Sequence, residues 1–222
     1  MKVARLASSM LAVALVVGLA VVAVASAAPE FKPTGATVTG AGGTGTLSAG
    51  GETVTCAEDV TTAGIIHTIW LIAKIIAYLR RCTGKTAAGE TCPVKSPGAP
   101  LENLIASTTL RAVLGLILPK PSSGSDVALV VLPESGSRFA TLSGSCIAET
   151  AVSGSLAGVV EPVGTSTTKG ALTFGVTGGA QNIKEVDLTT GGLIKPKLTA
   201  FAETATAVAT ETGTASSATE VT

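Results

Sequence analysis

Four cysteines carry the clearest chemistry in the sequence: Cys56, Cys82, Cys92 and Cys146. None forms a C-x-x-C pair, so the spacing indicates neither a Cys₄ zinc site nor a redox-active dithiol. An even set in an oxidising compartment favours two disulfides, and three connectivities are open. We expect Cys82–Cys92, which would staple a polar loop that has few apolar residues to hold it together. We also expect Cys56–Cys146, because each of these two ends a strand-like run.

Other motifs that could support catalysis or phosphate binding are incomplete. His67 is the only histidine and lies in an apolar run, so we interpret it as a satisfied surface or core side chain. Residues 40–45 fit G-x-G-x-x-G, but a strand and turn follow where a dinucleotide site needs a helix, which favours a glycine-rich β-turn. Gly84-Lys-Thr86 resembles the end of a phosphate-binding loop, yet Leu79 stands where its first glycine belongs. We therefore predict no catalytic, cofactor-binding or metal-ligating residues.

Acidic residues leave one enzymatic alternative open. A pair of Asp or Glu side chains can hydrolyse a glycosidic bond, but their separation is a three-dimensional quantity that the sequence does not give. Trp70 and Tyr78 are the only Trp and Tyr residues available as platforms for sugar rings. The chain has 15 basic and 15 acidic residues and only 14% charged residues, which argues against a nucleic-acid partner or a polybasic membrane patch.

The first 27 residues have the pattern of a signal peptide, and we expect an N-terminal signal helix there. Lys2 and Arg5 precede an apolar run over 10–24, and Ala25-Ser26-Ala27 supplies small residues for cleavage between Ala27 and Ala28. The apolar run is shorter than the roughly 20 residues that span a bilayer. We expect export, no stable membrane span after processing, and a secreted or cell-surface product of 195 residues.

The rest of the chain reads as short strands separated by turn residues. Runs rich in Val, Ile, Thr and Leu recur every 8–12 positions between Gly, Pro and Ser clusters. This pattern predicts an all-β fold, an antiparallel β-sandwich or barrel-like domain over 28–198. The Thr- and Ala-rich tail over 199–222 is predicted to form strands or to be disordered.

The segment 63–81 is ambiguous. Ile65, Ile69, Ile72 and Ile76 lie at helical spacing, which favours an amphipathic helix. The density of β-branched isoleucine favours a hairpin instead.

From about Gly45 to Asp187 the chain resembles an uncharacterised family of secreted β-rich proteins from soil actinobacteria of the Solirubrobacter type. The matching residues are Val54-Thr-Cys56, Gly64-Ile-Ile66, the apolar stretch before Cys82, Cys92, 110–115, 127–133, 139–146, 152–156, 161–163 and 171–174. The resemblance implies an all-β extracellular module and a hairpin over 63–81, with no activity or catalytic residues to carry over. Arg80-Arg81 departs from the family's small polar residues, so the helix stays open as an alternative.

These observations predict a secreted, non-enzymatic β-domain with a binding or structural role and contact with the cell surface or an extracellular polymer. The alternatives are an extracellular hydrolase with a carboxylate pair, or a small carrier or inhibitor with an apolar pocket. A closed domain with an apolar cavity would favour the carrier. The expected core consists of Val54, Ile66, Ile76, Leu110, Leu114, Val131, Phe139, Leu156, Leu172 and Phe174.

Overall fold

A computed structural model describes residues 27–177, 180–201 and 203–222 of the chain. All elements of regular secondary structure in these ranges are β-strands, which confirms the all-β prediction. The expected helix of the signal peptide lies outside the described residues. Within the described ranges there is no helix of the length and hydropathy needed to cross a membrane.

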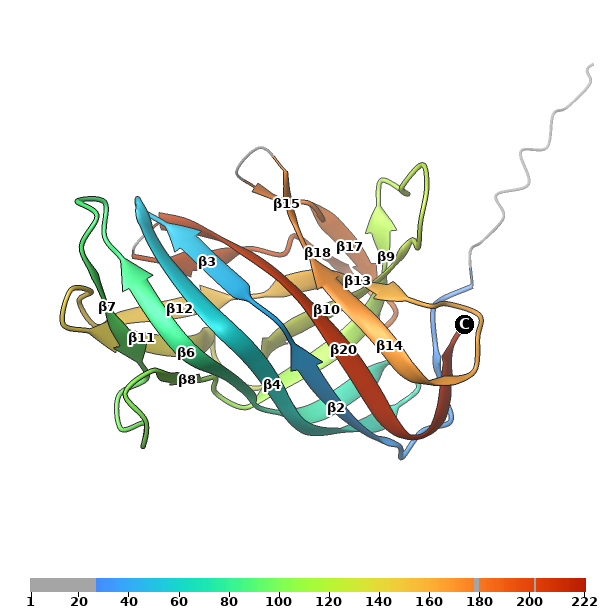
Figure 1. The fold of residues 1–222 in the computed structure, drawn as a ribbon. Helices are drawn as coiled ribbons and strands as arrows, with labels where there is room; N and C mark the ends of the chain where they lie inside the picture. Colours follow the sequence, from blue (N-terminus) through green and yellow to red (C-terminus); the bar gives the residue numbers. More distant parts are fainter. Residues whose placement is uncertain (1–26, 178–179, 202) are drawn as a thin grey trace, which may run out of the picture.

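The strands form a closed antiparallel ring in which each segment of the chain pairs with the next (Figure 1). Several of its eight segments are interrupted and contain two or three strands in line. In chain order they are β2 (Thr37–Gly42) with β3 (Gly45–Ala49); β4 (Glu52–Thr68); β5 (Leu71–Ile75) with β6 (Ala77–Lys85); β7 (Thr91–Lys95) with β8 (Leu104–Ala106) and β9 (Leu110–Leu118); β10 (Val127–Pro133) with β11 (Arg138–Gly144); β12 (Thr150–Gly154) with β13 (Leu156–Glu161); β14 (Thr167–Phe174) with β19 (Leu198–Ala200); and β20 (Glu203–Val221).

Pairing of the last segment with the first closes the ring. β20 pairs with β2 from Val38↔Ala215 to Gly42↔Glu211 and continues onto β3. On their other edge, β2 and β3 pair with β4. Three long antiparallel segments therefore make one wall of an elongated, barrel-like domain (Figure 1). A ring of eight segments is wide enough inside for side chains or for one small ligand.

The segment 63–81 forms strands, as the hairpin alternative predicted. β4 turns at residues 69–70 and returns as β5, with Ile66 opposite Ile72. β5 continues into β6 past Lys74, whose backbone is left-handed with φ of 60°. Ile65, at 41% exposure, faces outward while Ile66 and Ile72 are buried. Burial thus follows the two-residue period of a strand, and β-branched packing outweighs the helical spacing.

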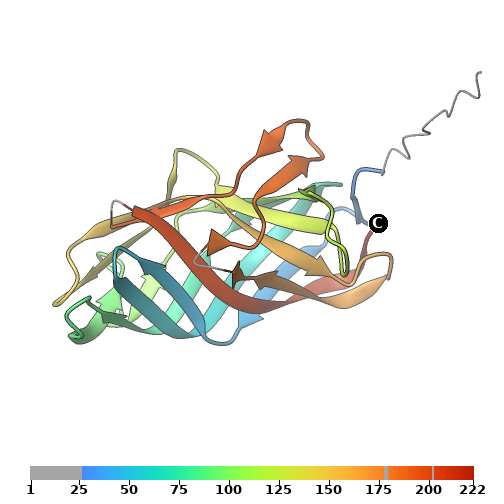
Figure 2. The same ribbon diagram turned by 90° about the horizontal axis from the view of Figure 1, so that it is seen from above.

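Short strands outside the ring cover its outer face and one of its ends. β1 (Phe31–Lys32) pairs with the end of β20. Between β14 and β19 the chain leaves the ring as β15 (Val176–Thr177), β16 (Ala180–Gln181), β17 (Glu185–Leu188) and β18 (Leu193–Ile194). This excursion lies over the outside of the ring (Figure 2), where β17 pairs with β9. Val186 of β17 and Val130 of β10 are fully buried in the outer cluster that it creates.

Two further clusters lie inside the ring, and most of the predicted core is found in them. Val54, Ile66, Leu110, Leu114, Val131 and Phe174 are buried. Phe139, Leu156 and Leu172 are partly buried and pack against these clusters. The prediction was wrong for Ile76, which is only partly buried. Its neighbour Ile75 takes the core position because the left-handed residue at Lys74 interrupts the strand alternation.

The disulfides join Cys56 to Cys82 and Cys92 to Cys146, so both predicted pairings were wrong. Cys56 and Cys82 are directly opposite each other on β4 and β6, with a Cα–Cα distance of 4.0 Å. Cys92 lies opposite Gly84 and not Cys82, and it meets Cys146 at a Cα–Cα distance of 5.7 Å. The β6–β7 turn needs no local disulfide, because Thr86 N–H donates to Glu90 O at 2.9 Å and Gly89 N–H donates to Thr86 O at 2.9 Å.

The tail is a strand, which confirms the ordered alternative. β20 covers 203–221 and is the longest strand of the described chain. Its side chains alternate, with Ala205 buried and Thr210, Thr212 and Thr214 exposed. The alternating Thr-Ala composition therefore corresponds to a strand with one exposed face and one face of small residues that lines the inside of the ring.

Candidate functional site

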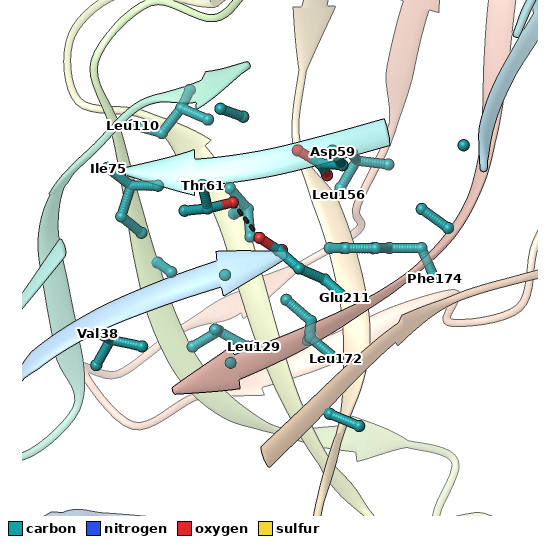
Figure 3. Close-up of a pocket in the computed structure, with 18 of the residues that line it drawn as sticks. Val38, Asp59, Thr61, Ile75, Leu110, Leu129, Leu156, Leu172, Phe174 and Glu211 are labelled. Carbon is teal, nitrogen blue, oxygen red and sulfur yellow. Dashed lines mark hydrogen bonds between the residues drawn. The ribbon is translucent and has the colours of Figure 1, made fainter. Parts of the chain in front are cut away.

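A cavity of about 280 Å³ occupies the inside of the ring. Its wall is mainly apolar and draws on strands from all around the ring. Side chains that line it include Val38, Ile75, Leu110, Leu129, Leu156, Leu172 and Phe174 (Figure 3). Apolar cavities of this kind accept apolar molecules in preference to water.

Polar side chains interrupt this apolar lining, and three of them lie together on one wall. Asp59 and Thr61 come from β4, and Glu211 comes from β20. The strand between them is β2, where Gly42 is paired with both Asp59 and Glu211 and Gly40 is paired with Thr61. The three side chains therefore share one wall of the cavity, over a strand that presents glycines (Figure 3).

The glycines of β2 make the room for these acids. A Cβ at Gly40 would overlap the Glu211 carboxyl group, and a Cβ at Gly42 would lie 3.1 Å from Asp59 Cβ. Residues 40–45 were predicted to be a glycine-rich turn, and that prediction was wrong. Gly40 and Gly42 lie within β2, and only residues 43–44 interrupt the strand before β3 begins. Their function in the fold is to leave space on the inner face.

The two carboxyl groups have few partners. The Thr61 hydroxyl donates a hydrogen bond to Glu211 Oε1. Asp59 Oδ1 is shielded from solvent and has no hydrogen-bond partner among the described residues. Burial, followed by the nearby charge of Glu211, raises the pKa of Asp59 to about 7. Burial also raises the pKa of Glu211, and the Thr61 hydrogen bond partly opposes that rise.

The cavity approaches the surface at one end of the ring. Its lining reaches exposed residues on both sides of the β13–β14 connection, namely Glu161 at the end of β13, Pro162 in the connection, and Thr168 and Lys169 at the start of β14. This connection is joined to the end of β20 by a hydrogen bond of 2.6 Å from Gly164 N–H to Val221 O. We therefore expect a ligand to enter at this end of the ring.

The N-terminal segment closes part of the same end. Phe31 is buried and lines the cavity. Glu30 and Thr222 exchange backbone hydrogen bonds of 3.1 and 3.0 Å, and Gly35 N–H donates to Ile66 O at 2.7 Å. The segment is thereby fixed to both β20 and β4.

His67, Gly84 and the predicted cleavage site lie apart from this site. His67 is exposed and lies in a surface hollow with Arg111 and Glu134. Gly84 is buried in β6, with a Cβ position blocked by Val94 Cγ2 at 2.6 Å, so it forms no phosphate-binding loop. Ala27 and Ala28 are exposed, and cleavage between them stays a prediction. No group of His, Cys, Asp or Glu side chains suited to a metal ion occurs in the part of the chain that the structure describes.

The pair of Asp59 and Glu211 was not found from the sequence, although a carboxylate pair was left open. Val54 and Cys56 face the core of the ring, so strict alternation places Asp59 on the outside. Instead, the inward positions change phase between Cys56 and Asp59, next to Arg81, which has a left-handed φ of 52° on the neighbouring β6. Glu211 lies about 150 residues away in the sequence. A non-local pairing and a backbone irregularity create the site.

No known family model, curated protein or solved structure matches this chain. The resemblance to secreted actinobacterial proteins therefore stays a prediction.

Proposed function

We propose that this protein is a secreted, non-enzymatic binding protein that holds a small, mainly apolar molecule inside its ring. The observation that carries the proposal is the cavity of about 280 Å³ inside a closed sheet, lined mainly by apolar side chains and open at one end of the ring. This volume is near the lower limit of ordinary small-molecule pockets, which are also mostly apolar with a few polar groups. The ligand would be about the size of a medium-length alkyl chain or of two to three aromatic rings.

Two features support release outside the cytoplasm. The disulfides Cys56–Cys82 and Cys92–Cys146 account for all four cysteines and are compatible with an oxidising, extracytoplasmic location. The leader over 1–27 supplies the export signal. A carrier that takes up or delivers an apolar molecule outside the cell agrees with both.

The carboxyl groups favour a second candidate, an extracellular hydrolase that uses Asp59 and Glu211. Perturbed pKa values in a cavity are typical of acid–base catalysts. Against this candidate, the two groups lie side by side on one wall, over Gly42, and do not face each other across an open groove. Recovery of a bound ester or glycoside unchanged after prolonged incubation would favour binding, and its cleavage would favour hydrolysis.

The binding proposal is tested with N-phenyl-1-naphthylamine, a fluorescent probe that is uncharged at neutral pH. We expect saturable binding of one probe molecule per chain of the oxidised, processed protein. Ala209→Phe should abolish this binding, because Ala209 is on the inner face of β20 and lines the cavity. Thr210→Phe is the matched control, since Thr210 is the next residue of the same strand and is exposed.

Two outcomes would contradict the proposal. One is the absence of saturable binding by a protein that circular dichroism shows to be folded. The other is equal binding by the wild type and by folded Ala209→Phe. Val38→Phe gives an independent block from β2, and it keeps the test decisive in the event that Ala209→Phe does not fold.

A further inference from the structure

We infer that the cavity selects ligands that carry a protonated amine, and that Asp59 and Glu211 together bind the ammonium group. This inference rests on the proposed binding function and adds the chemical class of the ligand. The apolar part of the ligand would lie against Leu129, Leu172 and Phe174 (Figure 3).

The first step is that the described part of the protein supplies no basic side chain to pair with Asp59 and Glu211. The ion pairs of the described residues occupy other acids, namely Glu30, Glu58, Glu102, Asp126 and Glu185. Of the charged residues that line the cavity, Lys169 is the one base, and it is exposed at the mouth. Arg80 and Arg81 on β6 are exposed as well. The two inner carboxyl groups thus have no basic partner among the described side chains.

The second step is that the fold reserves space for these acids. Gly40 leaves the position that the Glu211 carboxyl group occupies, and Gly42 lies beneath Asp59. Thr61 donates its one hydroxyl hydrogen to Glu211 Oε1 and orients that carboxyl group. Asp59 Oδ1 is left shielded and without a donor in the described chain. A buried acceptor without a partner costs free energy, and a donor on the ligand removes that cost.

The third step is chemical selection. A bound ammonium group favours the ionised form of the two acids, and ionised carboxylates only accept hydrogen bonds, so they would repel a ligand carboxylate or phosphate. A hydroxyl group offers one donor and no charge, whereas an ammonium group offers three donors and a positive charge. Charge-assisted hydrogen bonds are roughly twice as strong as neutral ones. In an otherwise apolar cavity, an alkyl or aryl amine therefore matches both the charge and the apolar wall.

The experiment compares octylamine, octanol and octanoate as competitors that displace N-phenyl-1-naphthylamine at neutral pH. These probes share one chain length and differ in the head group. We expect octylamine to bind at least ten-fold more tightly than octanol, and octanoate to bind most weakly. In the double variant Asp59→Asn, Glu211→Gln, the affinity ratio of octylamine to octanol should fall to about one. Asp126→Asn, which removes an acid paired with Lys120 outside the cavity, should leave that ratio unchanged.

The outcomes separate this inference from the function on which it rests. Equal affinities for the three competitors, or tightest binding of octanoate, would overturn the amine preference while the binding function stands. An amine preference that survives in the double variant would overturn the assignment to Asp59 and Glu211. Failure of the probe itself to bind would overturn the proposed function, and this inference with it. Each carboxamide variant is also tested alone, so that a folding defect of the double variant does not remove the comparison.

Discussion

Asp59 makes the stability of this protein depend on pH in an unusual direction. Its pKa is raised from 3.8 to about 7 in the fold, because the carboxyl group is buried and lies near Glu211. Between these two values the folded protein binds more protons at this position than the unfolded chain does. Stability therefore falls as pH rises through this window, whereas salt-bridged acids produce the opposite trend.

The size of the effect follows from the two pKa values. Each pH unit within the window is worth about 1.4 kcal/mol, so the change from pH 3.8 to about 7 amounts to about 4 kcal/mol. Partial solvent access to the side chain makes this an upper figure. Glu211, whose pKa is also raised by burial, adds a slope of the same sign. Above neutral pH the free energy of unfolding should level off at its lower value.

Urea unfolding of the oxidised protein between pH 5 and 8 measures this slope. Asp59→Asn keeps a neutral side chain at every pH, so its stability should vary less with pH than that of the wild type, which should lose about 3 kcal/mol at this position between pH 5 and pH 8. Asp126→Asn is the control. The hydrogen bond from Lys120 lowers the pKa of Asp126, so this acid is ionised in both states across the range and its loss shifts the curve without changing its slope. A wild-type curve that is flat or rises with pH, parallel to that of Asp59→Asn, would refute the argument.

Three further predictions concern the fold. Non-reducing peptide mapping should link Cys56 to Cys82 and Cys92 to Cys146, and recovery of a Cys82–Cys92 peptide would contradict this pairing. Loss of the Cys56–Cys82 bridge should lower the free energy of unfolding by about 3.5 kcal/mol, and loss of the Cys92–Cys146 bridge should lower it by about 4 kcal/mol. Gly158→Ala should lower the free energy of unfolding by about 1–3 kcal/mol in the same urea assay, because its Cβ would lie 2.7 Å from Leu172 Cδ1. Gly43→Ala is the control, since its Cβ would meet nothing within 4 Å, and its free energy of unfolding should stay within about 0.5 kcal/mol of the wild-type value. Leu114→Ala, at a fully buried position, should lower the free energy of unfolding by about 2–5 kcal/mol, measured by thermal or urea unfolding. An equal loss for Leu101→Ala, whose side chain is 58% exposed, would contradict the assigned core.

The parts of the fold that depend on local composition were predictable. Strand-like runs separated by glycine-rich turns gave the all-β class, and six of the ten expected core residues are buried. Ring closure was not predictable, since it depends on β20 pairing with β2 and β3 across more than 150 residues. The disulfides failed for a related reason. Proximity in the sequence favoured Cys82 and Cys92, but strand register places Cys82 opposite Cys56 and Cys92 opposite Gly84.

The glycines of residues 40–45 show why the candidate site was hidden in the sequence. Judged alone, Gly40 and Gly42 are an incomplete nucleotide motif or a turn. Within the sheet they are inward positions of a strand that lies between Asp59 and Glu211. Larger side chains there would fill the space that these carboxyl groups use. Two buried acids beside each other lower the stability of the unliganded protein near neutral pH, and no basic side chain of the described chain compensates them. Because a packed core of Val and Leu would avoid that cost, the arrangement is best understood as serving a ligand that supplies the missing positive charge.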